Sequence, residues 1–225
     1  MDLSNIFGIL GIIISNLLGL RIGISYWKSR YGLVHEYNEY LFYLSFAACL
    51  NWIYYSILIS DIYVYTSCIS AVVSTFGFIQ MLYASVQTSP FKLAIIETGC
   101  IIMLVLWLGL IWLQITNIVS QDLAIQIMGW ICSIIAVGKN FSPCLIIQKV
   151  ITTMDPTLIY FPHAFLGFVN LSLWVAYSIT IRDMFQLVSN GLSALVCLFQ
   201  LVVWGWVKCY KSNYVQTEKL DQIPL

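Results

Sequence analysis

Three uncharged side chains inside long apolar stretches have the chemistry to hold a small polar molecule. Asn190 carries an amide with two hydrogen-bond donors and a carbonyl acceptor, which suits two neighbouring hydroxyl groups. Trp52 and Trp174 each offer a wide indole face that can stack on an apolar C–H surface. Because none of the three residues is charged, we expect them to bind an uncharged ligand weakly.

Each of these residues also has a structural explanation. An asparagine at membrane depth can hydrogen-bond to a neighbouring helix, and tryptophans often form a belt at the membrane surface. Trp52 and Trp174 lie about two helical turns inside the end of their apolar stretches, which is deep for a belt residue. We therefore favour the binding role for both tryptophans.

Lys139 is a fourth candidate, and it is charged. It lies in the middle of an apolar stretch, one turn before Pro143. A charge at that depth is costly and marks a transport pathway or an ion pair by default. Lys139 is therefore a candidate pathway charge that could tune substrate choice, and the alternative is a charge that the fold only tolerates.

Other kinds of site have little support in the sequence. The seven cysteines are scattered singly, with no CxxC and no Cys/His spacing, so we expect packing residues and no metal. There is no GxxxxGK loop, which argues against coupling to ATP. The net charge is zero without a basic or acidic run, so nothing suggests a nucleic-acid partner. We expect neither an enzyme nor a bound cofactor.

The composition places these side chains in a membrane. Of 225 residues, 60% are hydrophobic and only 9% are charged, whereas a soluble domain carries about 25% charged residues. A helical span needs about 20 apolar residues. Seven stretches qualify, at residues 5–27, 40–60, 62–84, 93–115, 124–147, 157–180 and 184–207.

The basic residues predict which way the spans face. With the N-terminus outside, the inner segments hold seven basic residues, namely Lys28, Arg30, Lys92, Lys149, Lys208, Lys211 and Lys219, and the outer segments hold only Arg182. Cytoplasmic loops are enriched in lysine and arginine. We expect the N-terminus outside or in a lumen, and the C-terminus in the cytoplasm.

A short phrase occurs twice in the chain. WIYYSILISD at 52–61 and WVAYSITIRD at 174–183 match at six of ten positions, 122 residues apart. Both phrases end the second span of a three-span set. Two copies of three spans would face opposite ways, and a fourth crossing between them restores a common orientation. Transporters built from parallel repeats bind substrate at the repeat interface near the midplane.

We therefore predict an all-α membrane protein with seven transmembrane helices, arranged as two parallel three-helix bundles joined by a linker helix (3+1+3). The predicted units are a first repeat at 1–84, a linker helix at 85–122, a second repeat at 123–207 and a cytoplasmic tail at 208–225.

The sequence resembles the SWEET family of sugar transporters over nearly its whole length. The resemblance rests on the doubled phrase, on SPCLIIQKVITT from Ser142, on IYFP ending at Pro162 and on SNGLSALVCLFQL from Ser189. SWEET proteins are themselves an example of parallel repeats. The resemblance implies sugar transport, with membrane lipid as the surroundings, and related carriers associate as oligomers.

The resemblance also implies roles for particular residues. A tryptophan and an asparagine sixteen residues later line the sugar site of the family, and Trp174 and Asn190 have that spacing. The first-repeat counterparts are Trp52 and either Ser67, by the SxxSA alignment, or Cys68, by a gapless one.

Two further positions match the outer gate of the family. Tyr55 and Asp183 match a hydroxyl–carboxylate pair that closes this gate. Asp183 also has the place of an N-cap for the last span, and Asp61 has the same place before the third.

The prolines depart from the family pattern of one each in spans 1, 2, 5 and 6. Pro143 and Pro162 occupy the second-repeat positions, whereas spans 1 and 2 contain no proline. Proline removes a backbone hydrogen bond and bends a helix. We expect Pro143 and Pro162 to act as hinges near the inner gate, and most bending to occur in spans 5 and 6.

The expected function is that of a facilitative, bidirectional uniporter of a mono- or disaccharide, in the plasma membrane or the Golgi. One alternative is an amino-acid transporter of the PQ-loop type, although the chain has no Pro-Gln dipeptide. A seven-helix receptor is disfavoured by the short loops and the internal repeat. A membrane scaffold that does not transport is the remaining alternative, because the first-repeat prolines are missing.

Overall fold

The computed structural model describes residues 2–30, 39–84, 90–140 and 142–221, and these residues are helical apart from short turns. The chain order is α1 (Leu3–Arg30), α2 (Glu39–Leu58), α3 (Ile62–Ala84), α4 (Pro90–Ile115), α5 (Gln121–Asn140), α6 (Ser142–Thr153), the 3-10 turn η1 (Pro156–Leu158), α7 (Phe161–Ile181) and α8 (Met184–Asp221). The described ranges contain no strand.

Apolar segments of these helices account for the predicted crossings. Four segments are long and apolar enough to span a membrane, at Leu3–Leu20, Gln121–Thr153, Phe161–Ile181 and Met184–Lys211. Three shorter apolar segments lie at Ser45–Leu58, Ile62–Val73 and Val105–Ile115. The expected all-α membrane fold with seven transmembrane helices is confirmed, with α5 and α6 together forming the fifth crossing.

The helix bounds differ from the prediction in the second half of the chain. The fifth crossing is described as α5 and α6 on either side of Phe141, which lies outside the described residues, and together they form one apolar span from Gln121 to Thr153. The sixth begins at Phe161 rather than at residue 157, because Asp155 caps the separate turn η1. The backbone of α8 continues to Asp221, beyond the predicted end of the apolar span at residue 207.

The helices pack as two related sets. In the first bundle α3 contacts both α1 and α2, and in the second α8 contacts both α7 and the α5–α6 crossing. Between the bundles, α1 packs on α7 and α2 packs on α5. Each contact between bundles therefore joins a first span of one repeat to a second span of the other. This reciprocal pattern is what two equivalent parallel repeats produce.

The turns that follow α2 and α7 repeat the same backbone geometry. Ser60 and Arg182 both adopt a left-handed conformation, with φ of 58° and 59°. In each case the next residue, Asp61 or Asp183, donates its N–H to a carbonyl five residues earlier, as in a Schellman C-cap. The doubled phrase therefore encodes a doubled turn, and it places the two aspartates at equivalent positions.

Glycines bring helices together near these turns. A Cβ added to Gly8 of α1 would lie 2.7 Å from the ring of Tyr63, and one added to Gly129 of α5 would lie 2.5 Å from the ring of Phe185. Tyr63 and Phe185 each follow one of the two aspartates by two residues. Only glycine permits such an approach of helix and ring.

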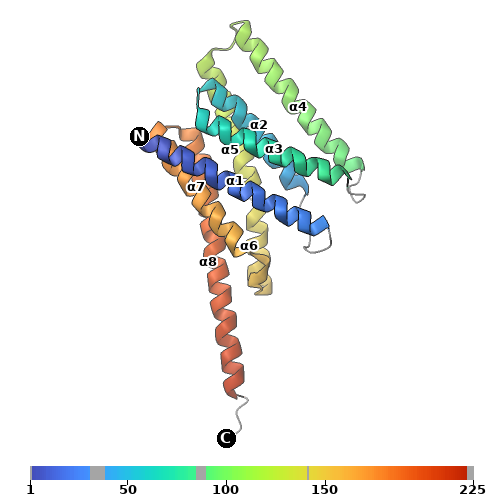
Figure 1. Cartoon of the computed structure of the whole chain (residues 1–225), viewed down its shortest axis with the longest axis vertical. Helices are drawn as coiled ribbons and strands as arrows, with labels where there is room; N and C mark the ends of the chain where they lie inside the picture. The colour runs from blue at the N-terminus through green and yellow to red at the C-terminus, as the bar shows by residue number, and fades with distance from the viewer. Residues whose placement is uncertain (1, 31–38, 85–89, 141, 222–225) are drawn as a thin grey trace.

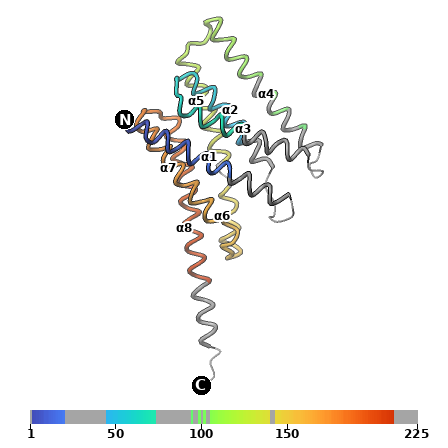
Figure 2. Tube along the Cα trace, in the orientation of Figure 1, coloured from blue at the N-terminus to red at the C-terminus, as the bar shows by residue number. Residues whose placement is uncertain are grey.

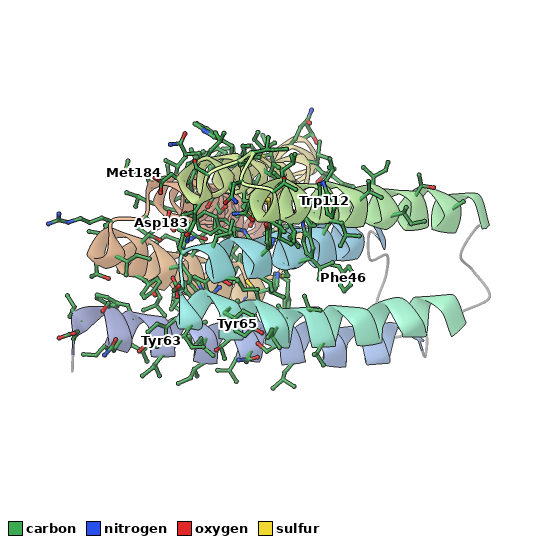
Figure 3. The ribbon with its side chains drawn as sticks, turned by 90° about the horizontal axis from the view of Figure 1, so that it is seen from above. Phe46, Tyr63, Tyr65, Trp112, Asp183 and Met184 are labelled. Atoms are coloured by element: carbon green, nitrogen blue, oxygen red, sulfur yellow. The ribbon has the colours of Figure 1, made fainter. Side chains whose placement is uncertain are left out.

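The linker helix α4 is attached to the first bundle by two polar contacts. Trp107 donates its indole hydrogen to Oδ1 of the buried Asn51 at 2.9 Å. Tyr54 donates its hydroxyl to Oε1 of Gln114 at 2.7 Å. Elsewhere α4 exposes apolar side chains such as Trp112, which Figure 3 shows on this helix.

The two sets of helices diverge from one end. In Figure 1, α5, α6 and α8 run toward the bottom, whereas α1, α2 and α3 run toward the right. Figure 2 traces the same courses and shows the start of α1 beside the turn between α7 and α8. The bundles are therefore close together at the end where Asp61 and Asp183 lie, which we call the aspartate end.

Candidate functional site

Tyr55 and Asp183 form a hydrogen-bonded pair across the interface between the two bundles. We call such a tyrosine–aspartate pair a lock. The hydroxyl of Tyr55 on α2 donates to Oδ2 of Asp183 at 3.0 Å. The N–H groups of Phe185 and Gln186 donate to Oδ1 of Asp183, at 2.9 and 3.1 Å. The sequence predicted a pairing with Tyr55 and an N-cap as separate roles of Asp183, and the structure contains both sets of hydrogen bonds in one conformation. Figure 3 shows Asp183 and Met184 at this end of the molecule.

Tyr177 and Asp61 form a second lock that the sequence analysis did not predict. The hydroxyl of Tyr177 on α7 donates to Oδ1 of Asp61 at 2.9 Å. Tyr177 and Asp61 correspond to Tyr55 and Asp183 when the repeats are aligned at 122 residues. The doubled phrase contained this signal, because each copy holds both a tyrosine and an aspartate at equivalent positions.

An aromatic series supports each lock. Trp52 meets Tyr55 edge to face with centroids 5.3 Å apart, and Trp174 meets Tyr177 in the same way at 5.5 Å. Tyr55 then meets Phe185 at 6.1 Å. Such edge-to-face pairs are favourable beyond the area they bury. The two tryptophans of the predicted site therefore each contact the tyrosine of the tyrosine–aspartate pair next to them.

Trp174 is held by a polar chain to α1. Its indole N–H donates to Oγ of Ser15 at 3.2 Å, and the Ser15 hydroxyl donates to Oδ1 of Asn170 at 2.9 Å. A Cβ added to Gly11 would lie 3.0 Å from the indole. Trp174 is buried at 7% exposure. Its orientation is therefore fixed from α1, and a ligand would meet the ring rather than its N–H.

The first-repeat candidates lie around the same cluster. Val64, Trp174 and Tyr177 form a buried core, and Trp52 and Cys68 pack against it. Ser67 is buried, and its carbonyl accepts the hydroxyl of Ser70 at 2.9 Å. The structure thus brings Trp52, Cys68 and Trp174 together.

Asn190 lies one helix away, on α8. It is half-buried, and in the part of the chain that the structure describes its amide has no hydrogen-bond partner. Among the described residues, the indole N–H of Trp174 donates to Ser15 and not to Asn190. An amide left unpaired at membrane depth is costly, so Asn190 is suited to a ligand that supplies both a donor and an acceptor.

Lys139 lies in the last turn of α5 and is half-buried. It is near enough to Cys49, Cys68 and Cys197 to act electrostatically on their thiols. These cysteines belong to α2, α3 and α8, so Lys139 lies near helices of both bundles.

The two prolines lie in the fifth and sixth crossings. Pro143 belongs to the fifth crossing, two residues after Phe141, which lies outside the described residues. Pro162 is the second residue of α7 and is exposed. Proline at a helix start removes no helical hydrogen bond, so Pro162 does not bend the interior of a helix. A hinge there would act between η1 and α7.

A pocket of about 520 Å³ lies at the aspartate end. Its lining is Tyr55, Ile59, Ser60, Asp61, Tyr177, Ile181, Arg182, Asp183, Met184 and Phe185. Trp52, Trp174 and Asn190 do not contribute to it. All four residues of the two tyrosine–aspartate pairs therefore line this pocket, whereas the predicted sugar-binding residues do not. Within the described ranges, no three His, Cys, Asp or Glu side chains come together as a metal site requires.

Comparison with known families and sequences gives consistent matches. Residues 126–212 match a family described as "Sugar efflux transporter for intercellular exchange". The chain is 25% identical to bidirectional sugar transporter SWEET10 of Arabidopsis thaliana over 211 residues, covering 90% of this chain and 70% of the relative. It is 24% identical to SWEET16 of the same plant, covering 92% and 90%.

A solved structure has the same fold. The structure of a eukaryotic SWEET transporter superposes with a TM-score of 0.74 at 17% identity, covering 92% of this chain and all of the other. At that identity the match establishes the arrangement of helices alone. Together with the family match over the second repeat and the full-length relatives, it confirms that the chain resembles the SWEET family and has its fold.

Proposed function

We propose that this protein is a facilitative sugar uniporter that works by alternating access. The observation that carries the proposal is the pair of tyrosine–aspartate locks, which join the two bundles at one end while the helices diverge from that end. A carrier needs a gate between two bodies that can separate. The relatives are described as bidirectional sugar transporters, which supports sugar as the substrate.

The proposed sugar site lies between the bundles behind the locks. Trp52 and Trp174 would present ring faces to the sugar C–H surfaces, and Asn190 would pair with its hydroxyls. Ser67 or Cys68 would complete the first-repeat side. The unpartnered amide of Asn190 and the shared cluster of Trp52, Cys68 and Trp174 support this arrangement.

Transport would run down the sugar gradient in either direction. A proton-coupled carrier needs a carboxylate in the central cavity, whereas Asp61 and Asp183 belong to the locks at one end. Lys139 would influence substrate choice from the side of α5. No group in this account moves charge across the membrane, so uptake would not depend on the membrane potential.

The proposed cycle opens the bundles alternately at each end. The locks would form the outer gate, with the N-terminus on the outer side and the C-terminus in the cytoplasm of a plasma or Golgi membrane. This orientation follows from the distribution of basic residues in the sequence; the side chains of Lys28, Arg30, Lys92 and Lys219 lie outside the described set. Hinges at Pro143 and between η1 and Pro162 would permit the inner ends to move.

The test is uptake by vesicles that contain the purified full-length protein. We expect labelled glucose or sucrose to enter with no ion gradient and no ATP, and preloaded sugar to leave at a similar rate. Labelled leucine serves as the matched alternative substrate. Uptake of leucine without sugar would indicate a PQ-loop type of function, and uptake of neither by folded protein would indicate a scaffold. Both outcomes would contradict the proposal.

A further inference from the structure

The two locks differ in how their aspartates are satisfied. At Asp183 the two carboxylate oxygens accept different sets of hydrogen bonds. Oδ1 accepts two backbone N–H groups as the N-cap of α8, and Oδ2 accepts the hydroxyl of Tyr55. Oδ2 also accepts the side-chain amide of Gln186 at 2.8 Å. Every oxygen of this carboxylate therefore has two donors.

At Asp61 a single oxygen accepts both the N-cap hydrogen bonds and the hydrogen bond from the tyrosine. Oδ1 accepts the backbone N–H groups of Tyr63 and Val64, at 2.9 and 3.1 Å, and also the hydroxyl of Tyr177 at 2.9 Å. Oδ2 is buried and has no hydrogen-bond partner in the described part of the chain. Three donors compete for the lone pairs of one oxygen, while the other oxygen is buried without a donor.

One sequence position explains the difference. Gln186 follows Asp183 by three residues, and Val64 follows Asp61 by three residues. Both side chains are buried, at 2% and 4% exposure. Gln186 reaches back to its aspartate, as the N3 residue of a capping box reaches back toward the N-cap. Valine has no donor to offer, so the second carboxylate oxygen of Asp61 stays bare.

We propose that the locks are unequal, and that Gln186 is the positioning residue that makes Tyr55–Asp183 the strong lock. Tyr177–Asp61 is then the weak lock, and it separates first when the aspartate end opens. This inference rests on the proposed function only in treating the locks as a gate. It assigns Gln186 and Val64 a role in gating that the tyrosine–aspartate pairs alone do not imply.

The physical reason concerns what each oxygen gains when the gate opens. Oδ2 of Asp61 is desolvated in the closed conformation, and contact with water on opening relieves that cost. Oδ2 of Asp183 already has two donors when the gate is closed, so opening breaks its hydrogen bond from Tyr55 without such relief. The closed conformation is therefore stabilised mainly through Asp183, and the asymmetry favours opening from the Asp61 side.

The experiment measures the distance between the two bundles at the aspartate end. Spin labels are placed at Ile57 of α2 and Ile179 of α7, through amino acids introduced by amber suppression, so that the native cysteines remain. These equivalent positions are 56% and 59% exposed. Double electron–electron resonance on the full-length protein in lipid nanodiscs then gives the ratio of open to closed populations.

Two variants change the amide donors beside the two aspartates, one by adding a donor and the other by removing one. Val64→Gln supplies the missing amide, and we expect it to lower the open-to-closed ratio about tenfold, the effect of one hydrogen bond to a charged group. Gln186→Met keeps the side-chain length but removes the donor, and we expect a rise of similar size. Val64→Met is the matched control for added volume, and it should leave the ratio near that of the wild type.

Two results would contradict the inference that the locks are unequal. If Gln186→Met leaves the ratio unchanged, Gln186 does not strengthen its lock, whatever happens at position 64. If Val64→Gln folds but shifts the ratio no more than Val64→Met does, the bare oxygen of Asp61 has no influence on the gate. These distances are measured without any transport, so a failure to carry sugar would contradict the proposed function and not this inference.

Discussion

Tyr177 donates its hydroxyl to the carboxylate of Asp61 at 2.9 Å, from the other repeat and 116 residues later in the chain. The equivalent contact, Tyr55 to Asp183, spans the same interface in the opposite sense. Each repeat thus supplies one tyrosine and one aspartate to these contacts. The contact occurs twice because both copies of the doubled phrase contain the tyrosine and the aspartate.

Removing both tyrosine hydroxyls should open the aspartate end. We expect Tyr55→Phe combined with Tyr177→Phe to raise the labelling rate of Cys68 by a membrane-impermeant maleimide about tenfold or more, because each change deletes a hydrogen bond to a carboxylate. Peptide mass spectrometry identifies the labelled cysteine. Tyr63→Phe is the control, since the Tyr63 ring packs on Tyr177 but the hydroxyl donors to the two aspartates are those of Tyr55 and Tyr177. Equal labelling in all variants would show that the locks do not close this end.

The close approach of α5 to Phe185 should make one glycine sensitive to substitution. In Gly129→Ala the new methyl group would lie 2.5 Å from the ring of Phe185, and such overpacking costs about 1–3 kcal/mol. Gly138→Ala on the same helix is the matched control, because nothing lies within 4 Å of its added Cβ. Thermal unfolding in detergent should show a lower midpoint for the first variant only. Equal midpoints would mean that the helices separate easily here.

Lys139 should affect transport more than folding. We expect Lys139→Met to keep the unfolding midpoint near that of the wild type, because the apolar stem is retained and a buried charge is removed. The relative uptake of different sugars should change, as measured by competition in vesicles. Lys149→Met, on the exposed surface of α6, should change neither. If Lys139→Met has the sugar preference of the wild type, the charge of Lys139 has no role in substrate choice.

The turn before α7 should weaken in acid. Two hydrogen bonds from Thr157, from its hydroxyl and its backbone N–H, lower the pKa of Asp155. A carboxyl with a lowered pKa stabilises the fold above its unfolded pKa, and this contribution is lost as the pH falls through its folded value. Asp155→Asn cannot titrate, so its unfolding midpoint should fall less than that of the wild type below about pH 4. Parallel pH curves for both proteins would contradict this role.

The sequence predicted the features that depend on local pattern. Apolar length predicted seven crossings, and the aspartates that end the two copies of the doubled phrase predicted the N-caps. The contact of Tyr55 with Asp183 was predicted from the resemblance to the SWEET family. The equivalent contact of Tyr177 with Asp61 needed only the repeat, applied a second time to the same residues.

Other features depend on contacts that leave no local pattern. Ser15 and Asn170 are 155 residues apart, and a small polar residue on an apolar helix does not indicate which distant side chain it will meet. The start of α7 was misplaced because IYFP is apolar, and hydropathy does not distinguish a helix from the extended residues that precede it. The difference between Gln186 and Val64 matters only once both carboxylates are placed.

The most direct test of the central claim is glucose counterflow in vesicles, comparing the wild type with Asn190→Ala. The account predicts accumulation of labelled glucose against preloaded unlabelled glucose in the wild type and almost none in Asn190→Ala, with equal unfolding midpoints. Gln126→Ala, which removes an exposed amide from α5, should behave like the wild type. Counterflow by Asn190→Ala at the wild-type rate would contradict a sugar site between the two bundles.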